Sequence, residues 1–387
     1  MGFAPFPHRP NVLGRRLVAP GSATFTEMTT SLDATRPIGG STALLQGRGL
    51  LLAGDIGGTK TALAVFSAER GPRAPLLQAE FQSAKYASLG VMVREFLAGA
   101  DLPIERATFA VAGPVIAGSS KVTNLPWVLV EPDLTAELQL RSVHLLNDLE
   151  AIAGAMVVLE SPDLHSLNAG EPVAGGALAV IAPGTGLGEA FLIWDGTRYR
   201  AFPSEGGHAD FAPTTELQAA LLAHLMKRFK RVSVERVCSG PGLFNIYEYL
   251  RVSGHAPESP ELARGLAAAA GDGPRLIGEA ALRRPDPDPL SRAALELFVS
   301  ILGAEAGNLA LKVLSTGGLY LAGGIPQRIL PALGDGRFMR PFVAKGRLGE
   351  MLARVPVHVV TLRAALLGAA LSGLEIAASS AVIARGR

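Results

Sequence analysis

Short apolar runs alternate with glycine-rich turns along most of the chain, and this pattern predicts a mixed α/β protein. Two of the turns are alike, because each lies between two apolar runs that are typical of the strands of a β-hairpin. The first hairpin covers residues 50–66 and turns at Gly54 to Thr59, and the second covers residues 178–194 and turns at Gly184 to Gly188. Two similar hairpins predict two related domains that face one ligand.

The pattern predicts further elements on both sides of a Gly- and Pro-rich stretch at residues 161–176, which we interpret as the link between the two halves. A helix that starts at Thr215, with Thr215 or Thr214 as its N-cap, is expected to end near Arg231. Residues 252–289 are typical of surface structure without chemistry. The remaining expected elements are strands at 78–81, 108–111, 142–146 and 357–360, a strand between the glycine pairs 317–318 and 323–324, and helices at 89–97, 149–159, 290–314 and 363–378, the last packing back on the first domain.

Length and composition predict two domains with substantial cores. The chain has 387 residues, of which 48% are hydrophobic and 18% are charged, as in a globular protein. We place a poorly ordered extension at residues 1–49, a small α/β domain at 50–158 plus about 362–387, and a large α/β domain at 159–361. Pro, Gly and Ser interrupt every short apolar run of the extension, so it has no signal-peptide core.

Charge and cysteine content narrow the function classes. The 36 basic and 34 acidic residues give a net charge of +2, too balanced for a nucleic-acid or membrane-surface footprint, so we expect a small-molecule partner. The single cysteine, Cys238, excludes an intramolecular disulfide and a cysteine-based zinc cluster, fits a reducing cytoplasm and is expected to be a packing residue. No stretch reaches the ~18 consecutive apolar residues of a membrane-spanning helix, and a soluble protein is expected.

The two glycine-rich turns are suited to phosphate, since glycine lets consecutive backbone N–H groups converge on an anion and a threonine hydroxyl adds a donor. The first turn is not a P-loop, because Thr59 stands where a glycine is needed before Lys60 and a strand follows instead of a helix. The second is not a dinucleotide fingerprint, because Glu189 stands at the position of its last glycine.

Polar residues follow the strand predicted at 142–146. Asn147 and Asp148 stand at its carboxyl end, where α/β proteins place their ligands. From the residues alone, Asp148 also fits a helix N-cap. His208 also fits a satisfied buried histidine, Glu205 a turn residue, and Glu235 a surface acid paired with Arg236.

Six motifs follow one another along the chain: the turn at 54–59, the strand end Leu146-Asn147-Asp148, the turn at 184–188, and the segments 205–213, 235–242 and 322–325. In this order they resemble the bacterial glucokinase family of the hexokinase, actin and Hsp70-like ATPase superfamily. The resemblance covers residues 50 onward. It implies an α/β, two-domain actin-like ATPase (ribonuclease H-like) fold with a central cleft.

The resemblance also implies an activity, the transfer of the γ-phosphoryl group of ATP to the 6-hydroxyl of D-glucose at the entry to glycolysis. Asp148 would be the catalytic base. The sugar would bind at Asn147, Asp148, Glu205, His208 and Glu235, with Asn124 a lower-ranked candidate. ATP would bring Mg²⁺, which would face Asp55 through water, so no metal site of the protein's own is implied. The implied nucleotide contacts are Gly54, Asp55, Ile56, Gly57, Gly58, Thr59, Gly184, Thr185, Gly186, Gly323 and Gly324, and a cytoplasmic homodimer is expected.

Two departures refine the resemblance. One cysteine cannot supply the zinc-binding cluster that is usual in the repressor, open-reading-frame and kinase family of sugar kinases. Lys60 stands where the other glucokinase branch often has asparagine, and its side chain would either touch a phosphate or point into solvent.

Two alternatives to a glucokinase are a kinase for another hexose and a non-catalytic glucose-binding regulator. A repressor would need a helix-turn-helix, and residues 1–48 are too short and too broken by Pro and Gly for one.

Overall fold

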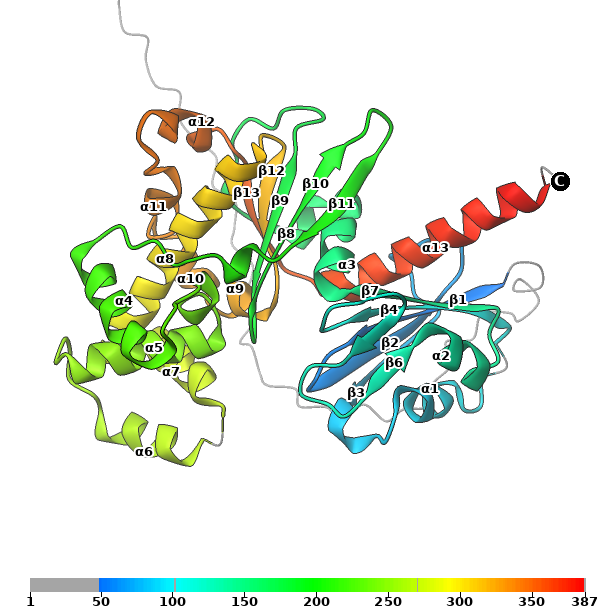
Figure 1. Cartoon of the computed structure of the whole chain (residues 1–387), viewed down its shortest axis with the longest axis horizontal. Helices are drawn as coiled ribbons and strands as arrows, with labels where there is room; N and C mark the ends of the chain where they lie inside the picture. Colours follow the sequence, from blue (N-terminus) through cyan, green and yellow to red (C-terminus); the bar gives the residue numbers. More distant parts are fainter. Residues whose placement is uncertain (1–48, 101, 270, 386–387) are drawn as a thin grey trace, which may run out of the picture. The chain divides into compact units, whose positions relative to one another are not determined.

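The structure is a computed structural model that describes residues 49–100, 102–269 and 271–385 (Figure 1). The expected extension at residues 1–49 lies outside the described residues except for Gly49. The elements described here belong to one compact unit, Leu45–Arg387.

The first half is built on a five-stranded sheet with the order β3-β2-β1-β4-β7. The predicted hairpin is confirmed, because β1 (Leu50–Ile56) pairs antiparallel with β2 (Lys60–Phe66), which pairs with β3 (Leu77–Gln82). Strands β4 (Ile104–Val111) and β7 (Ser142–Asn147) run parallel to β1, so the carboxyl ends of all three meet at one edge. A small ribbon, β5 (Ser119–Lys121) and β6 (Val128–Val130), follows β4.

The two faces of this sheet differ in side-chain size. Large side chains such as Leu63 and Phe109 fill the face that packs with α1 (Leu89–Leu97) and α2 (Glu131–Glu137). Alanines such as Ala53 and Ala62 line the other face, where α3 (Asp148–Ala155) and α13 (Ala364–Arg385) belong to the same core. Small side chains let helices approach closely, and α13 packs on β1 and β4, as predicted (Figure 1).

The second half is built on a six-stranded sheet with the order β11-β10-β9-β12-β13-β8. The second hairpin is confirmed, with β9 (Leu178–Pro183) antiparallel to β10 (Leu187–Trp194), and β11 (Tyr199–Ser204) follows. Strands β12 (Gly318–Leu321) and β13 (Val357–Val360) run parallel to β9. Residues 161–176 are more than a link, because β8 (Leu164–Asn168) pairs antiparallel with β13 as the edge strand.

Nine α-helices of the described residues accompany the second sheet, and α8 is the central one. Helix α8 (Pro289–Val313) is the one described helix long and apolar enough to cross a membrane, but 78% of its most apolar window is buried, as in a core helix. The predicted N-cap of α4 is confirmed, since Thr215 accepts a bond from the backbone of Gln218. Cys238 is fully buried, as predicted.

The other helices of the second half among the described residues are α4 (Glu216–Phe229), α5 (Gly240–Val252), α6 (Pro260–Ala268), α7 (Gly273–Leu282), α9 (Gly324–Arg328), α10 (Leu330–Leu333), α11 (Met339–Val343) and α12 (Gly349–Ala353).

The chain passes between the two sheets twice, at residues 156–163 and 361–363. The two passages are bonded to each other, because the Thr361 N–H donates to the Asp163 carbonyl oxygen at 2.8 Å. Arg73, from the loop after β2, donates to both carboxylate oxygens of Asp163 at 2.7 and 3.2 Å. This loop is therefore fixed to the first passage.

Candidate active site

Two acidic side chains meet at the carboxyl edge of the first sheet. Asp55 is near the end of β1, and Asp148 is the first residue of α3, directly after β7. Burial raises the pKa of Asp55 to about 6, and Arg363 opposes this shift with its positive charge. Burial also raises the pKa of Asp148 to about 6, and the nearby charge of Asp55 adds to the shift. The edge therefore holds two coupled carboxyl groups that titrate near neutrality.

Asn147 is the residue that caps α3. Its side-chain oxygen accepts a bond from the Leu149 N–H at 2.9 Å, and its amide donates to the Gly113 carbonyl at 2.9 Å. The N-cap is therefore Asn147 rather than Asp148. The Asp148 carboxylate shares this bond, since the Leu149 N–H also donates to its Oδ1 at 2.9 Å.

The first glycine-rich turn is held from several sides. The Gly57 N–H donates to the Lys60 carbonyl at 3.1 Å, and the Ser83 hydroxyl donates to the Gly57 carbonyl at 2.7 Å. A methyl group at Gly58 would overlap the carbonyl oxygen of Thr123, so only glycine fits beside that loop. The same methyl group would be 3.3 Å from Cβ of Asn124, which places this lower-ranked sugar candidate next to the turn.

Two predicted nucleotide contacts point away from Asp55. Gly54 and Ile56 alternate with Asp55 along β1, so they face the opposite side of the sheet. Ile56 is fully buried in the core on that side, and a methyl group at Gly54 would lie 2.8 Å from the Phe109 ring. Only the backbone of these two residues is available to a ligand.

The second glycine-rich turn is bonded to Glu235. The Gly184 N–H donates to the Gly186 carbonyl at 2.8 Å, and the Leu187 N–H donates to Oε2 of Glu235 at 3.0 Å. A methyl group at Gly186 would lie 2.5 Å from the same Oε2 atom. The interpretation of Glu235 as a surface acid paired with Arg236 is therefore wrong, since its carboxylate lies against this turn.

The loop that carries Glu205 and His208 reaches the same place. A methyl group at Gly207 would overlap the carbonyl of Leu187, the residue to which Glu235 is bonded. His208 is not a buried histidine, since its side chain is 56% exposed and that of Glu205 is 86% exposed, with 3.8 Å between Nε2 and Oε2. Both side chains are thus open to a ligand.

A cavity of 870 Å³ opens beside the second turn and is large enough for a nucleoside. Gly323, with φ of 85°, leads into α9, whose Gly324 lines this cavity, and a methyl group at Gly323 would lie 3.1 Å from the Pro183 carbonyl. The expectation that residues 252–289 are surface structure without chemistry is wrong, because α7 of this stretch lines the cavity. The lining includes Gly184 and Thr185 of the turn, Gly240 and Pro241 of α5, Pro274, Arg275, Gly278 and Glu279 of α7, and Gly324, Ile325 and Arg328 of α9.

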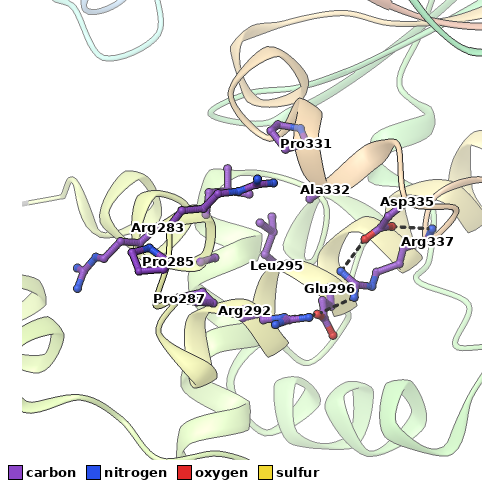
Figure 2. Close-up of a pocket in the computed structure, with 13 residues that line it drawn as sticks. Arg283, Pro285, Pro287, Arg292, Leu295, Glu296, Pro331, Ala332, Asp335 and Arg337 are labelled. Atoms are coloured by element: carbon purple, nitrogen blue, oxygen red, sulfur yellow. Dashed lines mark hydrogen bonds and ion pairs between the residues drawn. The ribbon is translucent and has the colours of Figure 1, made fainter. Parts of the chain in front are cut away.

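A second pocket, between the α7–α8 link and α10, is rich in arginine (Figure 2). Two of its arginines are paired within the chain, since Arg292 and Arg337 both pair with Glu296, at 2.9 and 3.0 Å, and Arg337 also pairs with Asp335 at 2.8 Å. Neither glycine turn lines this pocket, so we do not assign it to the candidate active site.

The two halves repeat one plan, an antiparallel hairpin with a glycine-rich turn beside parallel strands, and this plan defines a kinase of the actin-like ATPase class. The glucokinase family profile matches residues 52–376. A glucokinase from Nostoc sp. (strain PCC 7120) is 44% identical over an alignment 342 positions long, which covers 84% of this chain and 99% of that relative. The chain belongs to the glucokinase family.

Solved structures agree with this assignment. The structure of a glucokinase from an Antarctic psychrotroph is 32% identical, with a TM-score of 0.70, and the match covers 85% of this chain and all of that one. A glucokinase from Streptomyces griseus, solved with glucose and AMPPNP, is 21% identical, with a TM-score of 0.57 and 84% of this chain covered, and supports the fold. The predicted family, fold class and ATP-dependent sugar kinase activity are confirmed.

Proposed function

We propose that this protein transfers the γ-phosphoryl group of ATP to the 6-hydroxyl of D-glucose and forms glucose 6-phosphate and ADP. The observation that carries the proposal is the position of Asp148, a partly buried carboxylate at the sheet edge beside Asp55, in a chain 44% identical to a glucokinase. Phosphoryl transfer needs a group that orients the attacking hydroxyl and accepts its proton, together with groups that neutralise phosphate charge.

Asp148 is the base of this reaction. With a pKa of about 6, about nine-tenths of it is ionised at pH 7, and it remains basic enough to accept a proton from a sugar hydroxyl. Asn147 is the N-cap of α3, and the Asp148 Oδ1 also accepts a bond from the Leu149 N–H at the start of this helix. Asn147 would bind the neighbouring sugar hydroxyl.

ATP would lie with its phosphates between the two turns and its adenosine in the 870 Å³ cavity. The backbone N–H groups of Gly57–Thr59 and Gly184–Gly186 would cradle the phosphates, and Gly323 and Gly324 would allow the base and ribose to approach. Asp55 fits magnesium carried by the nucleotide, because Mg²⁺ is commonly held by one or two protein carboxylates, directly or through water. The metal would neutralise phosphate charge.

Glucose would bind where Glu235 and the loop of Glu205 and His208 converge on Leu187. Each hydroxyl is both a donor and an acceptor, so carboxylates and an imidazole can fix its orientation. Because a methyl group at Gly188 would overlap the Leu149 side chain, this sugar region lies beside the residue that follows Asp148. The sugar would thus span from the second half to the base of the first.

We also propose the division into a small domain at 50–158 plus about 362–387 and a large domain at 159–361. The packing of α13 on β1 and β4 supports the return of the chain to the small domain. A cytoplasmic location is supported by the single, buried cysteine. The resemblance predicts a homodimer, which sedimentation of the purified protein would test.

The test is to measure ATP consumption and sugar 6-phosphate formation with magnesium across a panel of hexoses, for the wild type and for Asp148→Asn. Glucose phosphorylation that falls about 10²–10⁴-fold in the variant, with glucose binding retained, is expected for loss of a general base. Preferred turnover of another hexose would reassign the substrate. Glucose binding without turnover of any sugar would make the protein a regulator rather than a kinase.

A further inference from the structure

Three residues on neighbouring strands lie in one row across the first sheet. Asp55 of β1 is opposite Ala62 of β2, and Ala62 is opposite Glu80 of β3. Directly opposed residues point to the same face of a sheet, so the two carboxylates are separated only by the alanine methyl group. Lys60, two residues before Ala62, points to this face as well. It is the first residue after the glycine-rich turn.

The Glu80 carboxylate is shared by two cations. Its Oε1 is 2.6 Å from Nζ of Lys60, and its Oε2 is 2.5 Å from Nη1 of Arg363. The bond from Lys60 is the main reason that the pKa of Glu80 lies below its usual value. Arg363 comes from the second passage between the sheets, directly before α13. Glu80 would therefore keep a neutralising partner if Lys60 moved away.

The contact between Lys60 and Glu80 is easily broken. The two side chains are 48% and 38% exposed, and ion pairs in such positions are screened by water and contribute little to stability. The backbone of Lys60 is fixed, because its carbonyl accepts a bond from the Gly57 N–H and so closes the turn. A flexible four-carbon stem on this fixed backbone gives the ammonium group a short path from Glu80 to an anion held by the turn.

We propose that Lys60 is a further phosphate-binding residue of this kinase, that Glu80 holds Lys60 beside the first turn, and that Arg363 neutralises Glu80 when Lys60 moves to the nucleotide. This inference rests on the proposed function, which places the ATP phosphates at the two turns. The sequence leaves two interpretations of Lys60, contact with a phosphate and exposure to solvent, and this inference favours the first. Glu80 and Arg363 are positioning residues, because they act through Lys60.

The inference is tested by calorimetric titration of Lys60→Met and Glu80→Gln with magnesium ADP and with adenosine. Loss of a charged contact to phosphate should weaken ADP binding about ten-fold in Lys60→Met and leave adenosine binding unchanged. Glu80→Gln should bind ADP several-fold more tightly, because a competitor for Lys60 is removed. Lys227→Met, which removes an exposed lysine of α4, is the matched control and should bind ADP as the wild type does.

The double variant Lys60→Met with Glu80→Gln separates competition for Lys60 from a general effect of charge. If Glu80 acts through Lys60, Glu80→Gln gains nothing in the Lys60→Met background. An equal gain in both backgrounds would overturn the role of Glu80, and weaker ADP binding by Glu80→Gln alone would do the same. By the same reasoning, Arg363→Met should weaken ADP binding, and this effect should vanish when Glu80 is also replaced by Gln. An effect of Arg363→Met that persists there would overturn the role of Arg363.

Titration of the wild type with ADP and with adenosine separates a failure of this inference from a failure of the proposed function. Equal affinity for ADP and adenosine would mean that the turns do not hold phosphate, and the proposed placement of ATP would fail together with the inference. Preference for ADP, with glucose phosphorylated, supports the placement. If Lys60→Met then binds ADP as tightly as the wild type, the inference alone is wrong.

Discussion

The side chain of Leu149 occupies the space in which a side chain at Gly188 would begin. Leu149 directly follows the proposed base on α3, and Gly188 belongs to β10, directly after the second turn. A strand and a helix from different halves thus touch at the point where sugar and phosphate would meet. A Cβ atom at 188 would push the Leu149 side chain out of its present position at the start of α3.

Replacement of Gly188 by Ala is therefore expected to damage both stability and catalysis. Overpacking of a well-filled contact destabilises by about 1–3 kcal/mol, and a small displacement of a catalytic group can lower kcat about 10²-fold. Thermal unfolding and steady-state kinetics would measure the two effects. Gly154→Ala is the matched control, because this glycine also lies in α3 but a methyl group there meets nothing within 4 Å. Equal behaviour of the two variants would contradict the proposed contact.

The local features of the site could be predicted from the sequence. The two hairpins could be predicted from short apolar runs on each side of a glycine-rich turn. The position of Asn147 and Asp148 at a strand end could be predicted because they follow an apolar run. These signals lie within a few neighbouring residues. The sugar-binding residues, in contrast, could be predicted only through the resemblance to the bacterial glucokinase family.

Features that depend on contacts between distant residues could not be predicted. The edge strand β8 is a short, largely polar run among glycines and prolines, and its partner β13 is almost 200 residues away. The bond of Glu235 to Leu187 joins residues that are 48 positions apart. Helix α7 lines the cavity because of how it packs beside α8 and α5, and its composition carries no sign of this.

The acidic limb of the pH–rate profile is expected near pH 6. The proposed base, Asp148, would have to be ionised to accept a proton, and its pKa is raised to about 6, as is that of Asp55. The value of kcat/KM for glucose should therefore be constant above pH 7 and fall as the pH decreases through about 6, with the pair titrating as a unit. Steady-state rates between pH 5 and 8 would show this. A profile that stays flat down to pH 5 would contradict the raised pKa values.

Deletion of residues 1–48 is expected to leave glucose phosphorylation and the melting temperature unchanged. The first strand begins at Leu50, and the family match begins at residue 52, so the proposed site is complete without these residues. Activity assays and thermal unfolding of the shortened chain would test this. A clear loss of either quantity would show that the extension contributes to the folded core.

Glu189 is a buried acid of the second half for which we propose no catalytic role. It lies on β10 and is 1% exposed, and its Oε1 has no hydrogen-bond partner among the described residues. Burial raises its pKa to about 7, and the charge of buried Glu305 adds to the shift, while Lys312 opposes it. A methyl group at Gly206 would overlap Oε2 of Glu189, so this carboxyl group lies directly beneath the sugar loop.

Glu189→Gln is therefore expected to stabilise the protein at high pH. The pKa of Glu189 is higher in the folded than in the unfolded chain, so its favourable contribution is complete below about pH 4.5 and is lost as the pH rises through about 7. Gln keeps the shape without the charge, so the gain should grow from pH 4.5 to 7 and level off at about 1–3 kcal/mol. Chemical denaturation at pH 5 and 8 would measure it, with the exposed Glu171→Gln as control. An equal effect at both pH values would show that Glu189 does not titrate in this range, and destabilisation at pH 8 would show that its charge is needed in the fold.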